Sequence, residues 1–123
     1  MVNKKFIYAS GFGDLEFDII KQMAQDKGYP TPIQIFEEHL DNIVENLKTI
    51  SVNKGTTARV RIILFENMDS KTVISFINDF KSLNLPPAIF AMVTEHSRQW
   101  TFRQLASHLI KEHKEMAQKK KNA

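Results

Sequence analysis

Arg59-Val-Arg-Ile-Ile-Leu-Phe65 is the stretch that decides the fold, because its β-branched and aromatic residues form an almost unbroken apolar run. Such a run is typical of a central β-strand that is covered on both faces. A shorter apolar run at Lys5–Ala9 is bounded by Ser-Gly and is also typical of a buried strand. Ile7 and Ile63 occupy matching places in the two runs, which predicts an internal repeat.

Each of these runs is followed by a segment of helical periodicity, a pair of prolines and a second short apolar run. The expected strands are Lys5–Ala9, Ile33–Phe36, Arg59–Phe65 and Ala88–Val93, and the expected helices carry the apolar sets Leu15/Ile19/Ile20/Met23/Ala24, Leu40/Ile43/Val44/Leu47, Val73/Phe76/Ile77/Phe80 and Phe102/Leu105/Ala106/Leu109/Ile110/Met116. This order predicts an α/β fold: a tandem β-α-β-α repeat forming one small four-stranded, mainly parallel or mixed sheet with helices packed on it. A ferredoxin-like α+β arrangement is the alternative.

The chain of 123 residues is expected to form a single domain made of two related halves, about 5–50 and 59–116. Residues 49–57 lack periodicity and are expected to be a flexible join, and the lysine-rich end, 117–123, is expected to be a disordered basic tail. The absence of cysteine excludes disulfides and thiolate metal sites. No apolar stretch approaches the roughly 20 residues that a membrane span needs, and a cytoplasmic location is the simplest expectation.

The formal net charge of +3 does not by itself indicate a nucleic-acid partner, because much of the excess lies at the two ends of the chain. The sequence also lacks an aromatic-rich strand of the kind that stacks RNA bases. Nucleic-acid binding through the basic tail is therefore the weakest of the alternatives.

The stretch Thr94-Glu-His-Ser-Arg-Gln-Trp100-Thr101 follows the fourth expected strand and contains the only tryptophan. Thr101 and Gln104 have the spacing of a capping box at the start of the last helix, which would make Trp100 and Leu105 a hydrophobic staple. This interpretation gives Trp100 a local structural role.

A second interpretation makes the same loop a binding site, because ligands collect at the carboxyl ends of parallel strands. Thr94, His96, Ser97 and Arg98 can all hydrogen-bond a polar partner, and tryptophan and arginine are favoured anchors in protein interfaces. The candidate binding residues are therefore Thr94, His96, Ser97, Arg98 and Trp100. No catalytic residue can be assigned.

The run from Ile89 through Thr94, Ser97 and Trp100 to Glu112-His113 resembles a small bacterial family, domain of unknown function 3783. Members of this family show an apolar strand, then Thr-x-x-Asn-x-x-Trp, a leucine-bearing helix and a closing Glu-His. The resemblance covers about residues 61–116, and the first half would be a degenerate copy. Ser97 stands where the family usually has asparagine. The resemblance implies no activity or substrate, but it groups Thr94, Ser97 and Trp100.

Glu38-His39 and Glu95-His96 form a repeated pair that could bind a metal if the two pairs met, although an ordinary polar exit from each strand is favoured. No cofactor and no metal site is therefore expected. The sequence favours a non-enzymatic protein-interaction or regulatory binding module, whose partner is an unknown protein or a second copy of the chain. The alternative is a binder of a small polar or anionic ligand, or an enzyme, that uses His96, Ser97 and Arg98. No membrane partner is expected.

Overall fold

A computed structural model describes the backbone of residues 4–50 and 55–121 and the side chains of 4–50 and 55–116. It contains a four-stranded mixed sheet in the order β2-β1-β3-β4. The strands are β1 (Phe6–Ser10), β2 (Ile33–Ile35), β3 (Ile62–Glu66) and β4 (Ile89–Met92). Strand β1 is parallel to β2 and β3 is parallel to β4, whereas β1 and β3 are antiparallel. The predicted α/β fold is confirmed, and the adjacent pairing of β1 with β2 differs from the split βαβ units of a ferredoxin-like fold.

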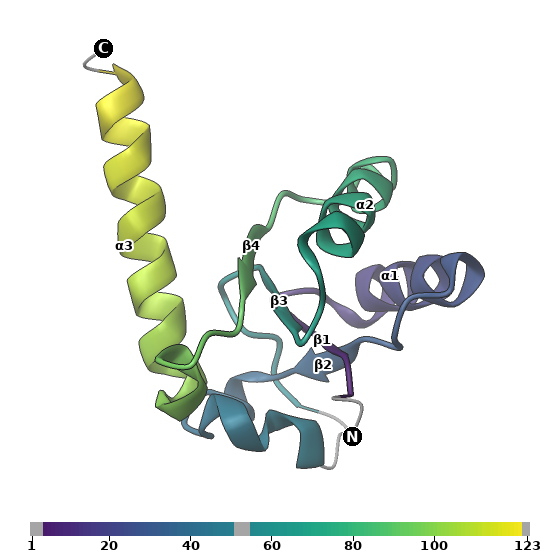
Figure 1. Cartoon of the computed structure of the whole chain (residues 1–123), viewed down its shortest axis with the longest axis horizontal. Coiled ribbons are helices and arrows are strands. Elements are labelled where there is room, and N and C mark those ends of the chain that lie inside the picture. The colour runs from purple at the N-terminus through teal and green to yellow at the C-terminus, as the bar shows by residue number, and fades with distance from the viewer. Residues whose placement is uncertain (1–3, 51–54, 122–123) are drawn as a thin grey trace.

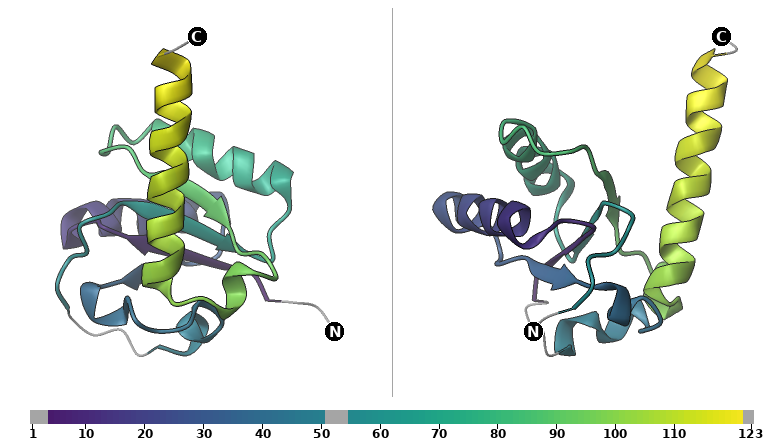
Figure 2. Two further views of the ribbon diagram at one scale, coloured as in Figure 1. Left: turned by 90° about the vertical axis from the view of Figure 1, so that its left-hand side faces the viewer. Right: turned by 180° about the vertical axis from the view of Figure 1, so that it is seen from behind.

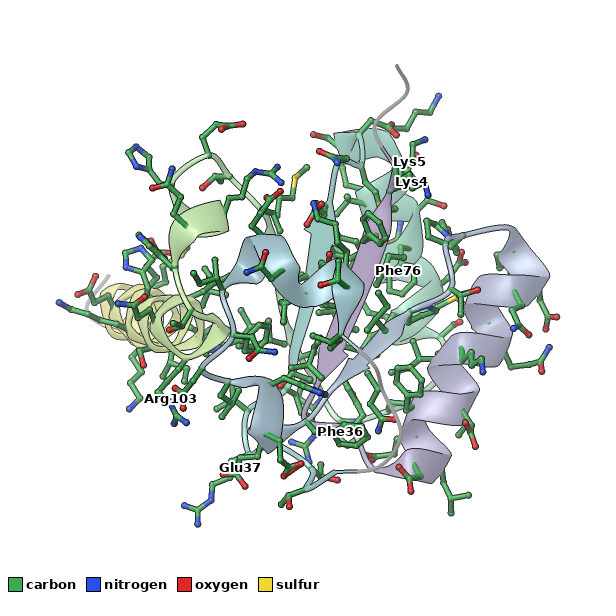
Figure 3. The ribbon with its side chains drawn as sticks, turned by 90° about the horizontal axis from the view of Figure 1, so that it is seen from below. Lys4, Lys5, Phe36, Glu37, Phe76 and Arg103 are labelled. Carbon is green, nitrogen blue, oxygen red and sulfur yellow. The ribbon has the colours of Figure 1, made fainter. Side chains whose placement is uncertain are left out.

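Helices cover the two faces of the sheet (Figures 1 and 2). Helices α1 (Asp14–Lys27) and α2 (Ser70–Lys81) lie on one face, and α3 (Phe102–Lys121) stands on the other. The core between the sheet and α1 and α2 includes Phe76, which Figure 3 shows in that layer. Alternate residues of the central strands serve the two faces, so Ile7 and Tyr8 belong to different cores.

Helix α1 begins after Gly13 and ends at Gly28, whose φ of 81° places it in the left-handed region that favours glycine at a helix end. The expected inward face of this helix is wrong in part. Leu15 is 82% exposed, while Phe17, which was not assigned to the core, is buried. The buried stripe of Phe17, Ile20, Met23 and Ala24 follows helical spacing from a start two residues later than expected.

The second expected helix, over residues 40–47, is not an α-helix. The chain forms two 3₁₀ helices instead, η1 (Glu37–His39) and η2 (Val44–Thr49). Ile43 lies between them in an antiparallel bridge with Thr101, and the N–H of Val44 donates to the carbonyl of Trp100 at 2.8 Å. Because this bridge takes backbone groups that a continuous α-helix would use internally, the apolar periodicity does not produce one.

The join between the halves is held to the first half where the structure describes it. The N–H of Glu37 donates to the carbonyl of Thr56 at 2.8 Å, and both carboxylate oxygens of Glu38 accept from the N–H of Thr56. Phe36 and Glu37, at the end of β2 and the start of η1, are labelled in Figure 3. Residues 51–54 of the predicted join and residues 122–123 of the predicted tail lie outside the described residues, and α3 extends as far as Lys121.

The two halves share the order strand, α-helix, parallel strand, and they meet symmetrically. The central ladder pairs Phe6 with Glu66, Tyr8 with Leu64, and Ser10 with Ile62. Ile7 and Ile63 are 56 positions apart (63 − 7 = 56). When every residue of the ladder is replaced by the one 56 positions away, the pair Phe6–Glu66 becomes the pair Ile62–Ser10, so the ladder is symmetric.

A second symmetric contact joins the halves at the base of α3. The N–H of Val44 donates to Trp100, and the N–H of Phe102 donates to Asn42 at 2.9 Å, on either side of the bridge between Ile43 and Thr101. The ladder and this bridge are therefore each locally symmetric.

Candidate functional site

The loop after β4 is organised by a reciprocal pair of hydrogen bonds. The N–H of Thr94 donates to Ser97 Oγ at 2.9 Å, and the N–H of Ser97 donates to Thr94 Oγ1 at 3.1 Å. Ser97 is 4% exposed and begins η3 (Ser97–Gln99). These contacts give Thr94 and Ser97 a role in shaping the turn, and an asparagine oxygen at residue 97 could accept the same N–H.

Trp100 ends this turn and lies two residues before the first residue of α3. The N–H of Thr101 donates to Gln104 Oε1 at 2.9 Å, and the N–H of Gln104 donates to Thr101 Oγ1 at 3.1 Å, so the predicted capping box is confirmed. Trp100 packs with Leu105 in the same apolar cluster, and its ring meets His108 edge-on at 5.3 Å between centroids. Trp100 is half-buried, so part of the indole remains accessible.

Beside Trp100 lies an open hollow of about 450 Å³ between β4 and α3, called the α3 groove below. Four of the five predicted binding residues line it: Thr94, His96, Ser97 and Trp100. Its apolar walls come from β4 and from α3, and its outer rim carries the pair formed by His108 Nε2 and Glu112 Oε1 at 2.8 Å. The groove is thus mainly apolar with a polar rim, as interaction surfaces are.

Arg98, the fifth predicted residue, does not line the α3 groove. Its Nη1 donates to Glu45 Oε2 at 2.8 Å and lies 3.7 Å from Glu66 Oε2. Lys48 Nζ bridges the same two carboxylates, at 3.1 Å from Glu45 and 3.2 Å from Glu66. We call Tyr8, Glu45, Lys48, Glu66 and Arg98 the charge cluster.

Glu66 is the centre of the charge cluster, because its side chain is fully buried and accepts from Tyr8 Oη at 3.1 Å. Burial and the negative charge of Glu66 raise the pKa of Tyr8 far above its ordinary range. The hydrogen bond from Arg98, followed by that from Lys48, lowers the pKa of Glu45. Two carboxylates face two cations, so the cluster is electrically balanced and ties η2 and η3 to the end of β3.

The charge cluster was missed in the sequence because its members are far apart in the chain and none belongs to a motif. Tyr8 lies in the run Lys5–Ala9 that is expected to be a buried strand, and it is fully buried, but the partner of its hydroxyl could not be predicted. A glutamate directly after an apolar run is an ordinary strand exit, so Glu66 carried no signal.

The two histidines that were matched in the sequence do not occupy equivalent places. His39 Nδ1 accepts from the N–H of Phe36 at 3.1 Å, as Ser97 Oγ accepts from Thr94. His39 is therefore the structural counterpart of Ser97 (97 − 39 = 58), and His96 is one residue out of register. Among the side chains that the structure describes, no group of three His, Cys, Asp or Glu residues could hold a metal ion. No helix in the described part of the chain is long and apolar enough to cross a membrane.

Together these features define a small mixed α/β domain with an apolar groove beside an edge strand. Residues 61–116, from β3 into α3, match the family described as Domain of unknown function (DUF3783), so the predicted resemblance is confirmed for this half. No curated protein and no solved structure matches the chain.

Proposed function

We propose that the protein is a non-enzymatic protein-interaction module that binds an extended segment along the outer edge of β4. The observation that carries this proposal is an edge strand whose outer side pairs with none of the described residues and which has a groove on each face. One side of the binding surface is then formed by four of the predicted residues, Thr94, His96, Ser97 and Trp100. Arg98 does not face this surface but fixes the position of the loop through its hydrogen bond to Glu45.

The backbone of β4 has hydrogen-bonding groups to offer. Ile89 and Val93 donate their N–H groups to Arg61 and Phe65 of the neighbouring chain segment at 2.9 and 2.8 Å. Because successive residues of a strand alternate in direction, the N–H and C=O groups of Phe90 and Met92 face outward. Nothing in the described part of the chain pairs with them.

The two edges of the sheet differ. The end of β2 is extended by an antiparallel bridge between Phe36 and Thr57, so that edge is partly covered. Charged residues and proline usually protect an exposed edge strand from pairing. In contrast, the six residues from Ala88 to Val93 include no charged residue and no proline. An unprotected apolar edge supports a binding role for β4.

Grooves flank β4 on both faces. The α3 groove lies on one face, and a second hollow of about 430 Å³, called the α2 groove below, lies on the other beside Phe80, Lys81, Leu85, Pro87 and Phe90. A strand added to an edge directs alternate side chains to opposite faces, so its main chain would supply affinity and the two grooves would select its side chains. Enzymatic and small-ligand roles receive less support, because the guanidinium of Arg98 is already engaged by Glu45.

A peptide library displayed on phage, followed by calorimetric titration of the selected peptides, tests the proposal. We expect peptides with alternating apolar residues that bind wild-type protein and lose at least about tenfold in affinity to Met92→Pro, which removes one outward N–H. Met92→Val keeps that N–H and is the matched control, expected to bind within a few-fold of wild type. Selected peptides that bind Met92→Pro as well as wild type, or a library that yields no binder, would contradict the proposal.

A further inference from the structure

We infer that a hollow at the carboxyl end of β1 binds a free α-amino acid that carries an apolar side chain. The hollow has a volume of about 190 Å³ and lies between β1, η1, the chain leading into β3, and α3. Strands β1 and β2 are parallel, and the carboxyl ends of parallel strands are where ligands collect in α/β sheets. The hollow shares no residue with the α3 groove or the α2 groove, so this inference goes beyond the proposed strand-binding edge.

The hollow corresponds to the place that the charge cluster fills in the other half of the chain. Ser10 is the last residue of β1 and lines the hollow, whereas Glu66 is the last residue of β3, and the two correspond in the symmetric ladder (66 − 10 = 56). Ala106 and Lys48 are related by the offset of the bridge at the base of α3 (106 − 48 = 58; 101 − 43 = 58). Lys48 Nζ reaches Glu66 at 3.2 Å, while the small side chains of Ser10 and Ala106 leave the corresponding space open.

The walls of the hollow suit an apolar side chain. They are formed largely by the apolar residues Leu40, Ala58, Val60, Phe102, Ala106 and Ile110. A cavity of about 150 Å³ is enough to bind benzene, so this hollow has room for a branched aliphatic or an aromatic side chain. It is smaller and more enclosed than the two grooves beside β4, which favours a small molecule over a chain segment.

Two arginines at the mouth of the hollow supply donors for a carboxylate. Arg59 and Arg103 are both exposed and line the hollow, and Arg103, at the base of α3, is labelled in Figure 3. Arg103 Nε donates to Asp41 Oδ1 at 2.9 Å, which leaves further N–H donors on the same guanidinium. Among the side chains that the structure describes, Arg59 forms no ion pair. A guanidinium can hold a carboxylate through bidentate hydrogen bonds.

Acceptors for an ammonium group lie in the same hollow. The carboxylate of Glu37 lines it and is exposed. Ser10 is buried and its hydroxyl donates to the carbonyl of Val60 at 3.0 Å, so the hydroxyl oxygen can still accept a hydrogen bond. The two arginines are balanced by Glu37 and Asp41 (2 − 2 = 0), so a zwitterion matches the hollow better than a simple anion does.

Calorimetric titration of the full chain with L-phenylalanine and L-leucine provides the first test. We expect at least one of them to bind saturably, and we expect the analogues that lack one charge, 3-phenylpropanoate and phenethylamine, to bind at least about tenfold more weakly than L-phenylalanine. An absence of binding by both amino acids at about 10 mM overturns the inference. Equal binding of 3-phenylpropanoate and L-phenylalanine overturns the assignment to an amino acid.

Substitutions then test the location of the site. Arg59→Gln and Glu37→Gln should each weaken amino-acid binding at least about tenfold, because each removes one charge that faces the ligand. Arg61→Gln changes an exposed arginine outside the hollow and is the matched control, with an unchanged Kd. Ala106→Leu should abolish binding by filling the hollow, with far-ultraviolet circular dichroism to show that the variant is folded.

Binding that is unaffected by both Arg59→Gln and Glu37→Gln, or that persists in a folded Ala106→Leu protein, overturns the inference and places the contact elsewhere. The hollow and β4 have no residue in common, so the outcome of these titrations is independent of the peptide titrations at the strand edge.

Discussion

Replacing Glu66 by glutamine should destabilise the protein far more than the same replacement at Glu45. Both carboxylates accept from Lys48 and face Arg98, but the side chain of Glu66 is fully buried while that of Glu45 is 44% exposed. Glutamine keeps the volume and can still accept from the hydroxyl of Tyr8. The comparison therefore isolates the effect of burying the negative charge.

The expected magnitudes follow from this difference in exposure. Removing a buried charge leaves its partners uncompensated and costs about 3–5 kcal/mol where both partners are buried. Lys48 and Arg98 retain 27% and 23% of their side-chain exposure, so water can partly rehydrate them. We expect a loss of about 2–3 kcal/mol for Glu66→Gln, and at most about 1 kcal/mol for the exposed pairs of Glu45 in Glu45→Gln.

Urea denaturation near neutral pH, followed by far-ultraviolet circular dichroism, measures both free energies of unfolding. The slope of the unfolding free energy against urea concentration should be the same for both variants, because the same surface is exposed when each one unfolds. Equal losses for the two variants, or a larger loss for Glu45→Gln, would refute the view that the buried carboxylate holds the charge cluster together.

Three further predictions concern the caps, the glycines and the buried phenol. Thr101→Ala should cost about 1 kcal/mol in thermal denaturation, and Gln104→Ala somewhat less, because each removes one side of the capping box at α3. Gly28→Ala should cost about 1 kcal/mol from its left-handed φ alone. Gly11→Ala should cost clearly more, since a Cβ there would also collide with the backbone carbonyl of Val60, and equal losses in denaturant melts would contradict this. The pKa of Tyr8 is raised in the folded protein. The stability that the protonated Tyr8 contributes should therefore be complete below about pH 10, where a tyrosine of the unfolded chain is also protonated, and should fall as the pH rises above this value. Unfolding of wild type and Tyr8→Phe at about pH 8 and about pH 11 measures this loss, and a constant difference would argue against it.

The sequence predicted the strands well because each is a short apolar run bounded by turn residues. The run in Arg59–Phe65 contains the observed β3 apart from Glu66, and Ala88–Val93 encloses β4. The direction of β3 relative to β1 could not be predicted, because register and direction depend on contacts between segments more than 50 residues apart. The prediction of a helix over residues 40–47 was wrong for the same reason, because backbone groups of this segment hydrogen-bond to Trp100 and form a bridge with Thr101.

The candidate site was predicted where the signal was local. Thr94, Ser97 and Trp100 lie within seven residues and form one turn, so a spacing motif could identify them. The direction of Arg98 depends on Glu45, which is far away in the sequence, and the second groove depends on the pairing of β4 with β3. Such features arise from tertiary packing and leave no periodic pattern in the chain.

The symmetric ladder between β1 and β3 has a consequence for chains built from the second half alone. Residues 61–116 without the first half would leave β3 open along the side that β1 now covers. The register that pairs Tyr8 with Leu64 would then place Leu64 opposite Leu64 of another chain, and Thr101 would face Thr101 at the base of the long helix. Such a chain would need a partner to cover this apolar edge, whereas the present chain covers it with its own β1.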